Sequence, residues 1–237
     1  ATDPLYISEM VLLVKKLLEK GYAYKSEGSV YFSIKKFKDY GKLAHLDMDG
    51  LSAGASGRVS SDEYDKENVS DFVLWKAYNE NDGDVFWETE LGKGRPGWHL
   101  ECSAMSIKNL GETFDIHTGG IDNCFPHHEN EIAQSESATD KKFVKYWMHS
   151  AFLNIDNEKM AKSAGNFFTL RDLIAQGLKP DAIRYALISA HYRMPLNFSN
   201  DLLNQSSSAI RRVKDFMSRM GKVKYDADEN EELSKLV

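Results

Sequence analysis

The sequence of 237 residues predicts an α/β fold that includes part of a parallel sheet. From Gly97 onward, short strand-like runs alternate with longer helix-like runs, the pattern produced when helices connect parallel strands. The length allows one large domain or two small ones with a real hydrophobic core. Hydrophobic residues make up 42% of the chain and charged residues 28%, values that are ordinary for a globular protein.

The N-terminal part predicts one helix followed by a hairpin. Residues 4–20 carry an apolar stripe at helical spacing, Pro4 suits a first helical turn, and Gly21 is a natural end. Residues 22–34 predict a hairpin that turns at Gly28. Three expectations follow: a polar stretch with short elements at best over 35–70, a buried strand or docking segment over 71–76, and a loop over 79–84.

The middle of the chain carries the α/β pattern. The expected elements are a helix over 98–110 that ends at Gly111, a strand over 113–117 that leads into Thr118-Gly119-Gly120, a helix from Pro126 to about residue 137, a strand over 145–148 and a strand-like run over 152–155.

The C-terminal part is expected to be helical. Thr169 and Asp172 have the spacing of a capping box, which predicts a short helix that ends at Gly177. Further helices are expected from near Pro180 and over 200–220. The last helix becomes basic towards its end, and the tail over 226–232 is acidic and expected to be loosely ordered.

Composition and charge exclude several classes of protein. Two cysteines are too few for a disulfide framework, so a reducing cytoplasm is the expected setting. No apolar run approaches the roughly 20 residues that span a bilayer, and no membrane association is expected. The net charge of −6 means that contact with RNA would need a local basic patch. The N-terminus lacks Met and any signal pattern, which suggests the middle of a longer protein.

Three potential zinc ligands are the most informative feature of the chain. His127 and Glu131 are four residues apart, which places both side chains on one helix face, and Cys102 shares that spacing with Trp98 on another expected helix. Zinc accepts sulfur, imidazole nitrogen and carboxylate oxygen. A structural site would need a fourth ligand, whereas a functional site would keep one position for water or substrate.

Spacing alone leaves other interpretations open. A single buried cysteine is usually a small core residue, and a His-x-x-x-Glu pair is usually a surface pair on a helix. Cys124 could in principle be a fourth ligand, but the nearby Pro126 restricts the turn, and packing is the default interpretation for this cysteine.

Two further motifs suggest a nucleotide site. The loop Lys159-Met160-Ala161-Lys162-Ser163 carries two ammonium groups, which can follow a triphosphate as charge moves onto pyrophosphate. The loop Thr118-Gly119-Gly120-Ile121-Asp122 allows close approach of a nucleotide, and Asp122 could hold a ribose hydroxyl or an ammonium group. Each motif by itself also fits an ordinary solvated loop.

Taken together, these segments resemble the catalytic domain of class I cysteinyl-tRNA synthetases. The resemblance rests on the order and spacing of five segments and covers nearly all of residues 1–215; the segments are 71–76, 94–105, 115–135, 159–169 and 191–199. It implies the second half of a Rossmann-like catalytic domain, with an inserted connective region before it and a helical segment after it.

The resemblance also implies roles for individual residues. Cys102, His127 and Glu131 match three of the family's four zinc ligands, and Trp98 and His117 match residues that line the cysteine pocket. Gly119, Gly120 and Asp122 match the adenylate-binding loop. Lys159 to Ser163 matches the signature loop KMSKS, with Lys162 as the ATP-binding lysine.

The implied reaction joins the carboxylate of L-cysteine to ATP, releases pyrophosphate and passes the cysteinyl group to the 3′ end of tRNA(Cys). Zn²⁺ is the implied cofactor, and ATP is a substrate together with Mg²⁺. Zinc bonds a thiolate far better than a neutral hydroxyl, so it can separate cysteine from serine, which an apolar pocket does poorly. The expected protein is a cytoplasmic monomer.

Several features depart from the family pattern. Ala161 replaces a serine, Thr118 stands where glycine is usual, and neither a HIGH-type motif nor the fourth zinc-binding cysteine is found. The chain is therefore expected to be an internal, inactive piece of a longer synthetase. Its expected parts are a connective region over 1–77, the second half of the catalytic domain over 78–157, the lysine loop and stem-contact region over 158–200, and the start of a helical bundle with the acidic tail over 201–237.

Two alternatives come from the same residues. A related ligase couples cysteine to an aminosugar in mycothiol synthesis and shares the zinc and lysine-loop logic without tRNA. His191-Tyr192-Arg193 and the basic helix around Arg211 favour tRNA over that acceptor. The other alternative is a non-catalytic zinc-binding interaction module, which would retain zinc but would have no affinity for ATP.

Overall fold

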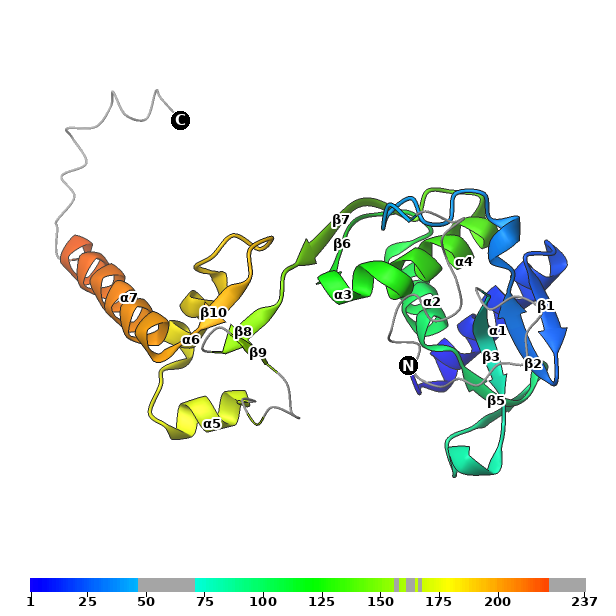
Figure 1. Cartoon of the computed structure of the whole chain (residues 1–237), viewed down its shortest axis with the longest axis horizontal. Helices are drawn as coiled ribbons and strands as arrows, with labels where there is room; N and C mark the ends of the chain where they lie inside the picture. The colour runs from blue at the N-terminus through cyan, green and yellow to red at the C-terminus, as the bar shows by residue number, and fades with distance from the viewer. Residues whose placement is uncertain (47–70, 156–157, 161–164, 166–167, 222–237) are drawn as a thin grey trace, which may run out of the picture. The chain divides into compact units, whose positions relative to one another are not determined.

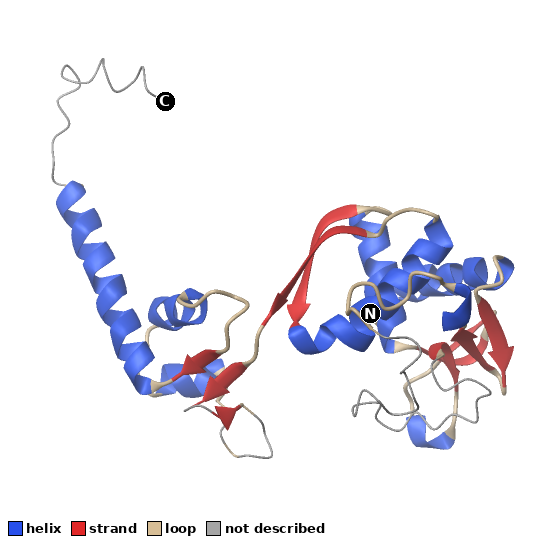
Figure 2. Cartoon of the chain, turned by 45° about the horizontal axis from the view of Figure 1, so that its top comes forward, coloured by secondary structure: helices blue, strands red, loops and turns tan. Residues whose placement is uncertain are grey.

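Residues 1–46, 71–155, 158–160, 165 and 168–221 are described by the computed structural model. The chain forms two units, Ala1–Ser150 and Ala151–Val237, and each is described separately here. Both units combine helices with sheets, as Figure 2 shows, so the α/β expectation is confirmed. The expected strand and docking segment at 71–76 is also confirmed, as a strand, while most of the polar stretch at 35–70 lies outside the described residues.

Helix α1 (Pro4–Glu19) and the first hairpin form as the sequence predicts. The Asp3 carboxylate accepts a hydrogen bond from the Leu5 amide at 2.8 Å, so it caps the helix that Pro4 begins. Strands β1 (Ala23–Ser26) and β2 (Ser29–Phe32) then pair antiparallel. Glu27 and Gly28 both have positive φ, 48° and 78°, which matches the twist that a two-residue hairpin turn needs.

The first unit contains a five-stranded antiparallel sheet in the order β1-β2-β3-β5-β4 (Figure 1). Its other strands and two short 3-10 turns are β3 (Phe72–Ala77), β4 (Trp87–Thr89), β5 (Gly92–Pro96), η1 (Ile34–Lys36) and η3 (Glu80–Asp82). The β4–β5 hairpin is not among the sequence expectations, because its strands are short and rich in charge and glycine. Gly94 leaves room for β3, since a Cβ there would lie 2.1 Å from the Lys76 carbonyl oxygen.

The core of the first unit lies between this sheet and helices α1, α2 (Trp98–Leu110) and α4 (Glu129–Thr139). Phe32, Trp75 and Leu100 are fully buried within it. Burying one such side chain contributes about 1.5–3 kcal/mol. This core holds α2 and α4 side by side, and these two helices carry the candidate metal ligands.

A parallel pair of strands follows the sheet, as the alternating pattern predicts. Strand β6 (Phe114–Gly120) pairs with β7 (Val144–Ser150), and His117 lies opposite Trp147. The connection runs through α3 (Ile121–Asn123), the helical turn η4 (Cys124–His128) and α4. Two details differ from expectation: β6 continues through both glycines of its expected loop, and helical structure begins before Pro126 but is interrupted at the extended Phe125.

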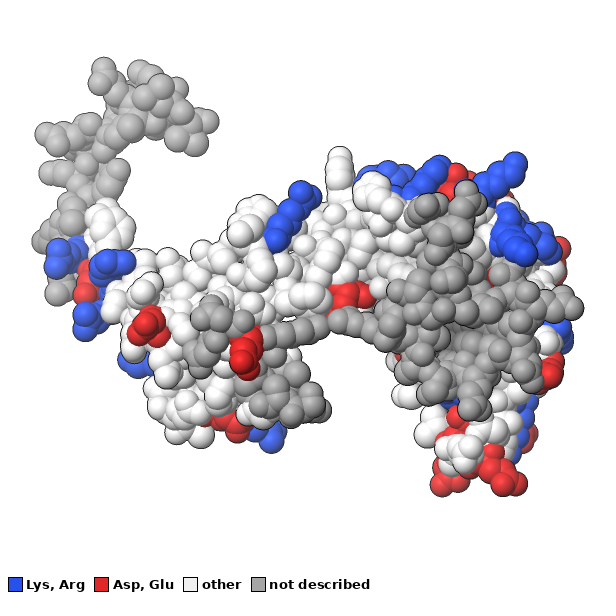
Figure 3. Space-filling model, in the orientation of Figure 1, with Lys and Arg blue, Asp and Glu red and all other residues white. Residues whose placement is uncertain are grey.

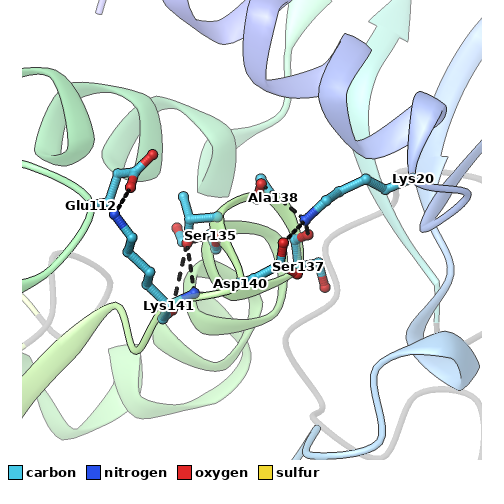
Figure 4. A network of polar contacts seen from close by, with 8 residues as sticks. Lys20, Glu112, Ser135, Ser137, Ala138, Asp140 and Lys141 are labelled. Carbon is cyan, nitrogen blue, oxygen red and sulfur yellow. Dashed lines mark hydrogen bonds and ion pairs between the residues drawn. The ribbon is translucent and has the colours of Figure 1, made fainter.

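The C-terminus of α4 is held by a lysine from α1, as Figure 4 shows. The Lys20 ammonium donates to the carbonyl oxygens of Ser137 and Ala138 at 2.9 and 3.2 Å, and to the Asp140 carboxylate at 2.6 Å. A cation at this end of a helix satisfies carbonyls that have no partner within the helix and interacts favourably with the helix dipole.

The described residues of the second unit form a small sheet in the order β10-β8-β9 together with helices (Figure 1). The elements are β8 (Leu153–Ile155), β9 (Glu158–Lys159), α5 (Leu170–Ala175), α6 (Pro180–Ile188), β10 (Leu196–Phe198) and α7 (Asn200–Met220). Strands β8 and β10 are parallel, and buried Ile155, Ile183 and Phe198 form part of the core.

The expected capping box at the start of α5 is confirmed. The Asp172 amide donates to Thr169 Oγ1 at 3.2 Å, and the Thr169 amide donates to Asp172 Oδ2 at 2.7 Å. The two units are defined by internal contacts, so the four-part functional division expected from the sequence stays a prediction.

Candidate metal centre

Helices α2 and α4 bring the three predicted zinc ligands together. Cys102 lies on α2, His127 at the end of η4, and Glu131 in the first turn of α4. One ligand atom from each lies within 4.8 Å of the other two. Bond lengths of 2.0–2.3 Å around tetrahedral zinc would separate ligand atoms by about 3.3–3.7 Å. A small adjustment of side chains would therefore bring these three atoms to a metal.

The carboxylate of Glu131 fits a metal ligand. The side chain is fully buried, with Oε1 2.9 Å from His127 Nε2 and Oε2 3.4 Å from His117 Nε2. Despite these short distances, neither oxygen makes a hydrogen bond of acceptable geometry. The two histidines offset the burial of this carboxylate, and a cation between the ligand atoms would stabilise it further. The donor set of thiol, imidazole and carboxylate is one that zinc accepts.

A second histidine orients the imidazole of His127. His99 Nδ1 lies 2.9 Å from His127 Nδ1, which leaves His127 Nε2 directed at Glu131. Gln134 Nε2 donates to the His99 carbonyl oxygen at 2.5 Å, and the Trp98 ring stacks on His127 at a centroid distance of 4.2 Å. Histidine ligands of metals commonly use their second nitrogen in this way. The sequence reasoning missed His99, although it lies directly beside Trp98.

Glu131 also belongs to a second potential ligand group. One ring nitrogen of His117, one ring nitrogen of His128 and one carboxylate oxygen of Glu131 all lie within 4.8 Å of one another. His128 Nδ1 in turn lies 2.8 Å from His149 Nε2 on β7. The sequence reasoning assigned His117 to the cysteine pocket and missed His128 and His149. The adjacent pair at 127–128 and the histidine directly after the expected strand over 145–148 were the available signals.

Burial and neighbouring charges set the proton affinities of these groups. Burial, together with Glu131 and Glu101, raises the pKa of the Cys102 thiol to about 11. Burial raises the pKa of Glu131, but His117 and His127 outweigh it and hold that pKa below its usual value. Burial lowers the pKa of His128 to about 4. At neutral pH the metal-free site therefore holds a carboxylate, a neutral His128 and a protonated thiol.

The two glycines of β6 have a packing role. A Cβ on Gly119 would lie 2.7 Å from His128 Cε1, and a Cβ on Gly120 would lie 2.4 Å from Asp122 Oδ1. Glycine at these positions lets the His128 ring and the Asp122 carboxylate approach the strand. The implied contact of Gly119, Gly120 and Asp122 with an adenylate stays a prediction.

Cys124 is not a member of the candidate ligand set, and the lysine loop belongs to the second unit. Cys124 Sγ is 4.0 Å from the Leu43 carbonyl oxygen, and Cys124 belongs to neither ligand group found in the described part of the chain. Lys159 is the last residue of β9 in the second unit. Lys162 and the rest of the loop through Ser163 lie outside the described residues. Their roles with ATP stay predictions.

Comparison with known proteins identifies the family. The profile described as "tRNA synthetases class I (C) catalytic domain" matches residues 3–208, which is most of the chain. The chain belongs to this family. The family match agrees with the mixed helix and sheet structure of both units.

Curated relatives share much of the sequence. A cysteine–tRNA ligase of Brachyspira hyodysenteriae is 61% identical over 220 residues, which is 93% of this chain and 46% of the relative. A cysteine–tRNA ligase of Chlamydia pneumoniae is 56% identical over 217 residues, which is 91% of this chain and 45% of that relative. The chain thus spans somewhat less than half the length of the relatives it matches.

The likeness to solved structures is weaker. A LeuRS–tRNA–LeuAMS ternary complex from Agrobacterium radiobacter K84 has a TM-score of 0.41 and 13% identity, covering 61% of this chain and 23% of that chain. A TM-score this low supports no argument about the site.

Proposed function

We propose that this chain forms part of an enzyme that activates L-cysteine with ATP and transfers it to tRNA(Cys). The observation that carries the proposal is that Cys102, His127 and the buried Glu131 meet. The carboxylate oxygens of Glu131 make no hydrogen bond of acceptable geometry. This group lies in a family whose similar curated relatives are cysteine–tRNA ligases. A site for a thiol-binding metal is the chemistry expected of an enzyme that must select cysteine.

Cys102, His127 and Glu131 hold zinc in this proposal. Zinc supplies an exchangeable position that binds the substrate thiolate and rejects the serine hydroxyl. Trp98 and His117 line the cysteine pocket beside it. Their placement supports these roles, because Trp98 stacks on His127 and His117 lies 3.4 Å from Glu131.

The proposed ATP-binding residues are assigned from sequence motifs. Lys159 and Lys162 stabilise the charge that develops on the triphosphate as pyrophosphate leaves, with Mg²⁺ as the accompanying ion. Gly119, Gly120 and Asp122 hold the adenosine part. The replacement of the loop serine by Ala161 removes one hydroxyl and keeps both lysines. We expect at most weaker closure of the loop.

The proposed acceptor is tRNA(Cys). The chain has a net charge of −6, so a nucleic acid needs a local basic surface. Helix α7 carries Arg211, Arg212, Lys214 and Arg219, of which Lys214 pairs with Asp181. Figure 3 shows lysine and arginine side chains in this part of the molecule, with acidic side chains among them. The other proposed properties are a monomeric state and no membrane contact. No helix in the described residues is long and apolar enough to cross a membrane.

We also propose that these 237 residues do not complete the reaction alone. In the described residues the metal group has three ligands, and β6 and β7 form a sheet of two strands. Parallel sheets are normally covered on both faces, yet Ile116 is 56% exposed and Tyr146 is 67% exposed. Further strands and a further ligand would complete both features.

The proposal is tested by ATP–pyrophosphate exchange. We expect a protein that contains this sequence and has the length of its relatives to exchange pyrophosphate in the presence of cysteine and not of serine. The Cys102→Ala variant should lose that exchange, and the isolated 237 residues should show none. Exchange that is independent of cysteine would refute the proposed function, and full exchange by the isolated chain would refute only its incompleteness.

The acceptor is tested separately. Transfer of cysteine to an aminosugar and not to tRNA would favour the mycothiol ligase. Retention of zinc with no affinity for ATP or for a cysteinyl-adenylate analogue, in the longer protein, would favour a non-catalytic zinc-binding module.

A further inference from the structure

Two buried polar residues lie between the candidate ligands His127 and Glu131. Glu129 has no exposed surface and Asn130 has 2%, yet neither is in a potential ligand group. Both side chains instead contact residues 40–44, a turn that lies far away in the sequence. The short segment that carries two candidate metal ligands therefore also holds a loop.

Glu129 makes its contacts with backbone amides of that loop. Oε1 accepts from the Gly41 amide at 2.7 Å, and Oε2 accepts from the Ala44 amide at 3.0 Å. In the described residues Glu129 has no ion pair, so these amides are what compensate its buried charge. Such a carboxylate fixes the loop strongly, because each amide bonds to a charged acceptor.

Asn130 adds a second attachment beside the first. Its Oδ1 accepts a hydrogen bond from the hydroxyl of Tyr40, whose ring is buried in the same core as α4. The Leu46 amide closes the loop on the Gly41 carbonyl oxygen at 2.9 Å. Residues 40–44 are thus attached to the ligand segment at both Glu129 and Asn130.

We propose that residues 40–44 are a metal-coupled loop and that Glu129 is the positioning residue that joins this loop to the metal ligands. The inference rests on the metal site proposed above. His127 and Glu131 lie two residues to either side of Glu129, so a displacement of the Glu129 backbone changes the separation of the two ligands. A carboxylate anchored by the amides of Gly41 and Ala44 resists that displacement.

The coupling is reciprocal because binding free energies are linked. If the anchored loop favours the ligand geometry that binds zinc, then bound zinc must favour the anchored loop by the same factor. Zinc should therefore protect the amides of Gly41 and Ala44 from hydrogen exchange. A side chain with a purely structural role would hold these amides equally well with and without metal.

The first test measures zinc affinity of the whole chain by competition with a chelating dye. Glu129→Gln replaces one carboxylate oxygen by an NH₂ group, which cannot accept from a loop amide. We expect zinc affinity to fall roughly tenfold or more, the usual effect of losing a residue that orients ligands. Glu136→Gln is the matched control on the same helix, where Oε1 accepts one hydrogen bond from the Phe143 amide at 3.0 Å. It should leave zinc affinity unchanged.

Tyr40→Phe is a milder substitution than Glu129→Gln and changes a residue of the loop. It removes the hydroxyl that binds Asn130 and keeps the buried ring, so it should fold even where Glu129→Gln does not. We expect a smaller loss of zinc affinity than for Glu129→Gln. Hydrogen exchange of the Gly41 and Ala44 amides should slow with zinc in the unaltered chain, and this slowing should be reduced in Tyr40→Phe. The Phe143 amide should respond equally in both proteins.

The outcomes separate this inference from the proposed function. Unchanged zinc affinity in both Glu129→Gln and Tyr40→Phe, or zinc-independent exchange of the loop amides, would overturn the coupling and leave the metal site standing. Absence of zinc binding in a protein that contains this sequence and has the length of its relatives would overturn both. Weaker zinc binding in the loop variants, with unchanged binding in Glu136→Gln, would support the coupling.

Discussion

At the residue scale, the two cysteines differ in what surrounds them. Cys102 lies with His127 and the buried Glu131, whereas Cys124 lies near the Leu43 carbonyl oxygen and outside both ligand groups of the described residues. Both thiols are partly buried, and burial raises the pKa of each. Their environments, and not their reactivity or exposure, therefore distinguish a candidate ligand from a packed cysteine.

This difference predicts opposite results for the same substitution. Cys102→Ser should lower zinc affinity by at least about tenfold, because zinc bonds a thiolate much better than a hydroxyl. Cys124→Ser should leave zinc affinity unchanged. Zinc content after dialysis and competition with a chelating dye measure both. Equal losses in the two variants would contradict the ligand set.

The raised pKa of Cys102 predicts a pH dependence. With a pKa of about 11, the thiol is protonated near neutral pH without metal, and it must lose that proton to bind zinc as a thiolate. Raising the pH removes the competing proton, so zinc affinity should increase about tenfold per pH unit between about pH 7 and 9. Titration with zinc at several pH values measures the slope. In Cys102→Ser the slope should flatten, and an unchanged slope would contradict proton release from this thiol.

At the element scale, α4 is fixed at both ends by residues distant in sequence. Glu129, at its start, holds residues 40–44, and Lys20 of α1 binds the carbonyls at its end (Figure 4). These contacts keep α4 against α2, which is why Cys102 can lie near His127 and Glu131. The helical spacing of His127 and Glu131 was predictable from sequence, but the approach of α2 depends on this packing.

Removal of the lysine should weaken α4. Lys20→Met keeps an apolar stem and removes the cation from three oxygens, so we expect the free energy of unfolding to fall by about 1 kcal/mol. Lys15 lies on α1, the helix that Lys20 caps, and forms an exposed ion pair with Glu90 in the turn between β4 and β5; Lys15→Met should have no measurable effect. Urea denaturation of both variants tests this. Equal stability of the two variants would show that the Lys20 contacts contribute little.

At the scale of the whole molecule, the chain consists of two units with separate cores. All residues of both candidate ligand groups lie in the first unit, and the described part of the lysine loop lies in the second. Units with separate cores can unfold separately. Metal binding should therefore stabilise only one of them.

Calorimetry with and without zinc tests this division. We expect two transitions, with zinc raising the midpoint of the one that belongs to residues 1–150. At a zinc concentration about 100 times the dissociation constant, binding stabilises that unit by about 2.7 kcal/mol. In Cys102→Ser the shift should shrink, while the second transition should stay in place in both proteins. A single transition that moves as a whole would show that the units unfold together.

Local structure and a candidate set of metal ligands could be predicted from the residues alone. Helices α1, α2 and α7 lie within a residue of their expected bounds, because proline, capping residues and glycine mark helix ends locally. The donor set of Cys102, His127 and Glu131 was also readable, because ligand chemistry and helical spacing are properties of residues. The β4–β5 hairpin was missed, since short strands without apolar alternation depend on their neighbours in the sheet.

Which side chains meet could be read only from the folded chain. It brought His99 to His127, His149 to His128, and residues 40–44 to Glu129, across separations that no local pattern encodes. It also separated Cys102 from Cys124, which the sequence had left open. The physical reason is that packing of α2 and α4 on a shared core sets these distances, and that packing depends on side chains from the whole first unit.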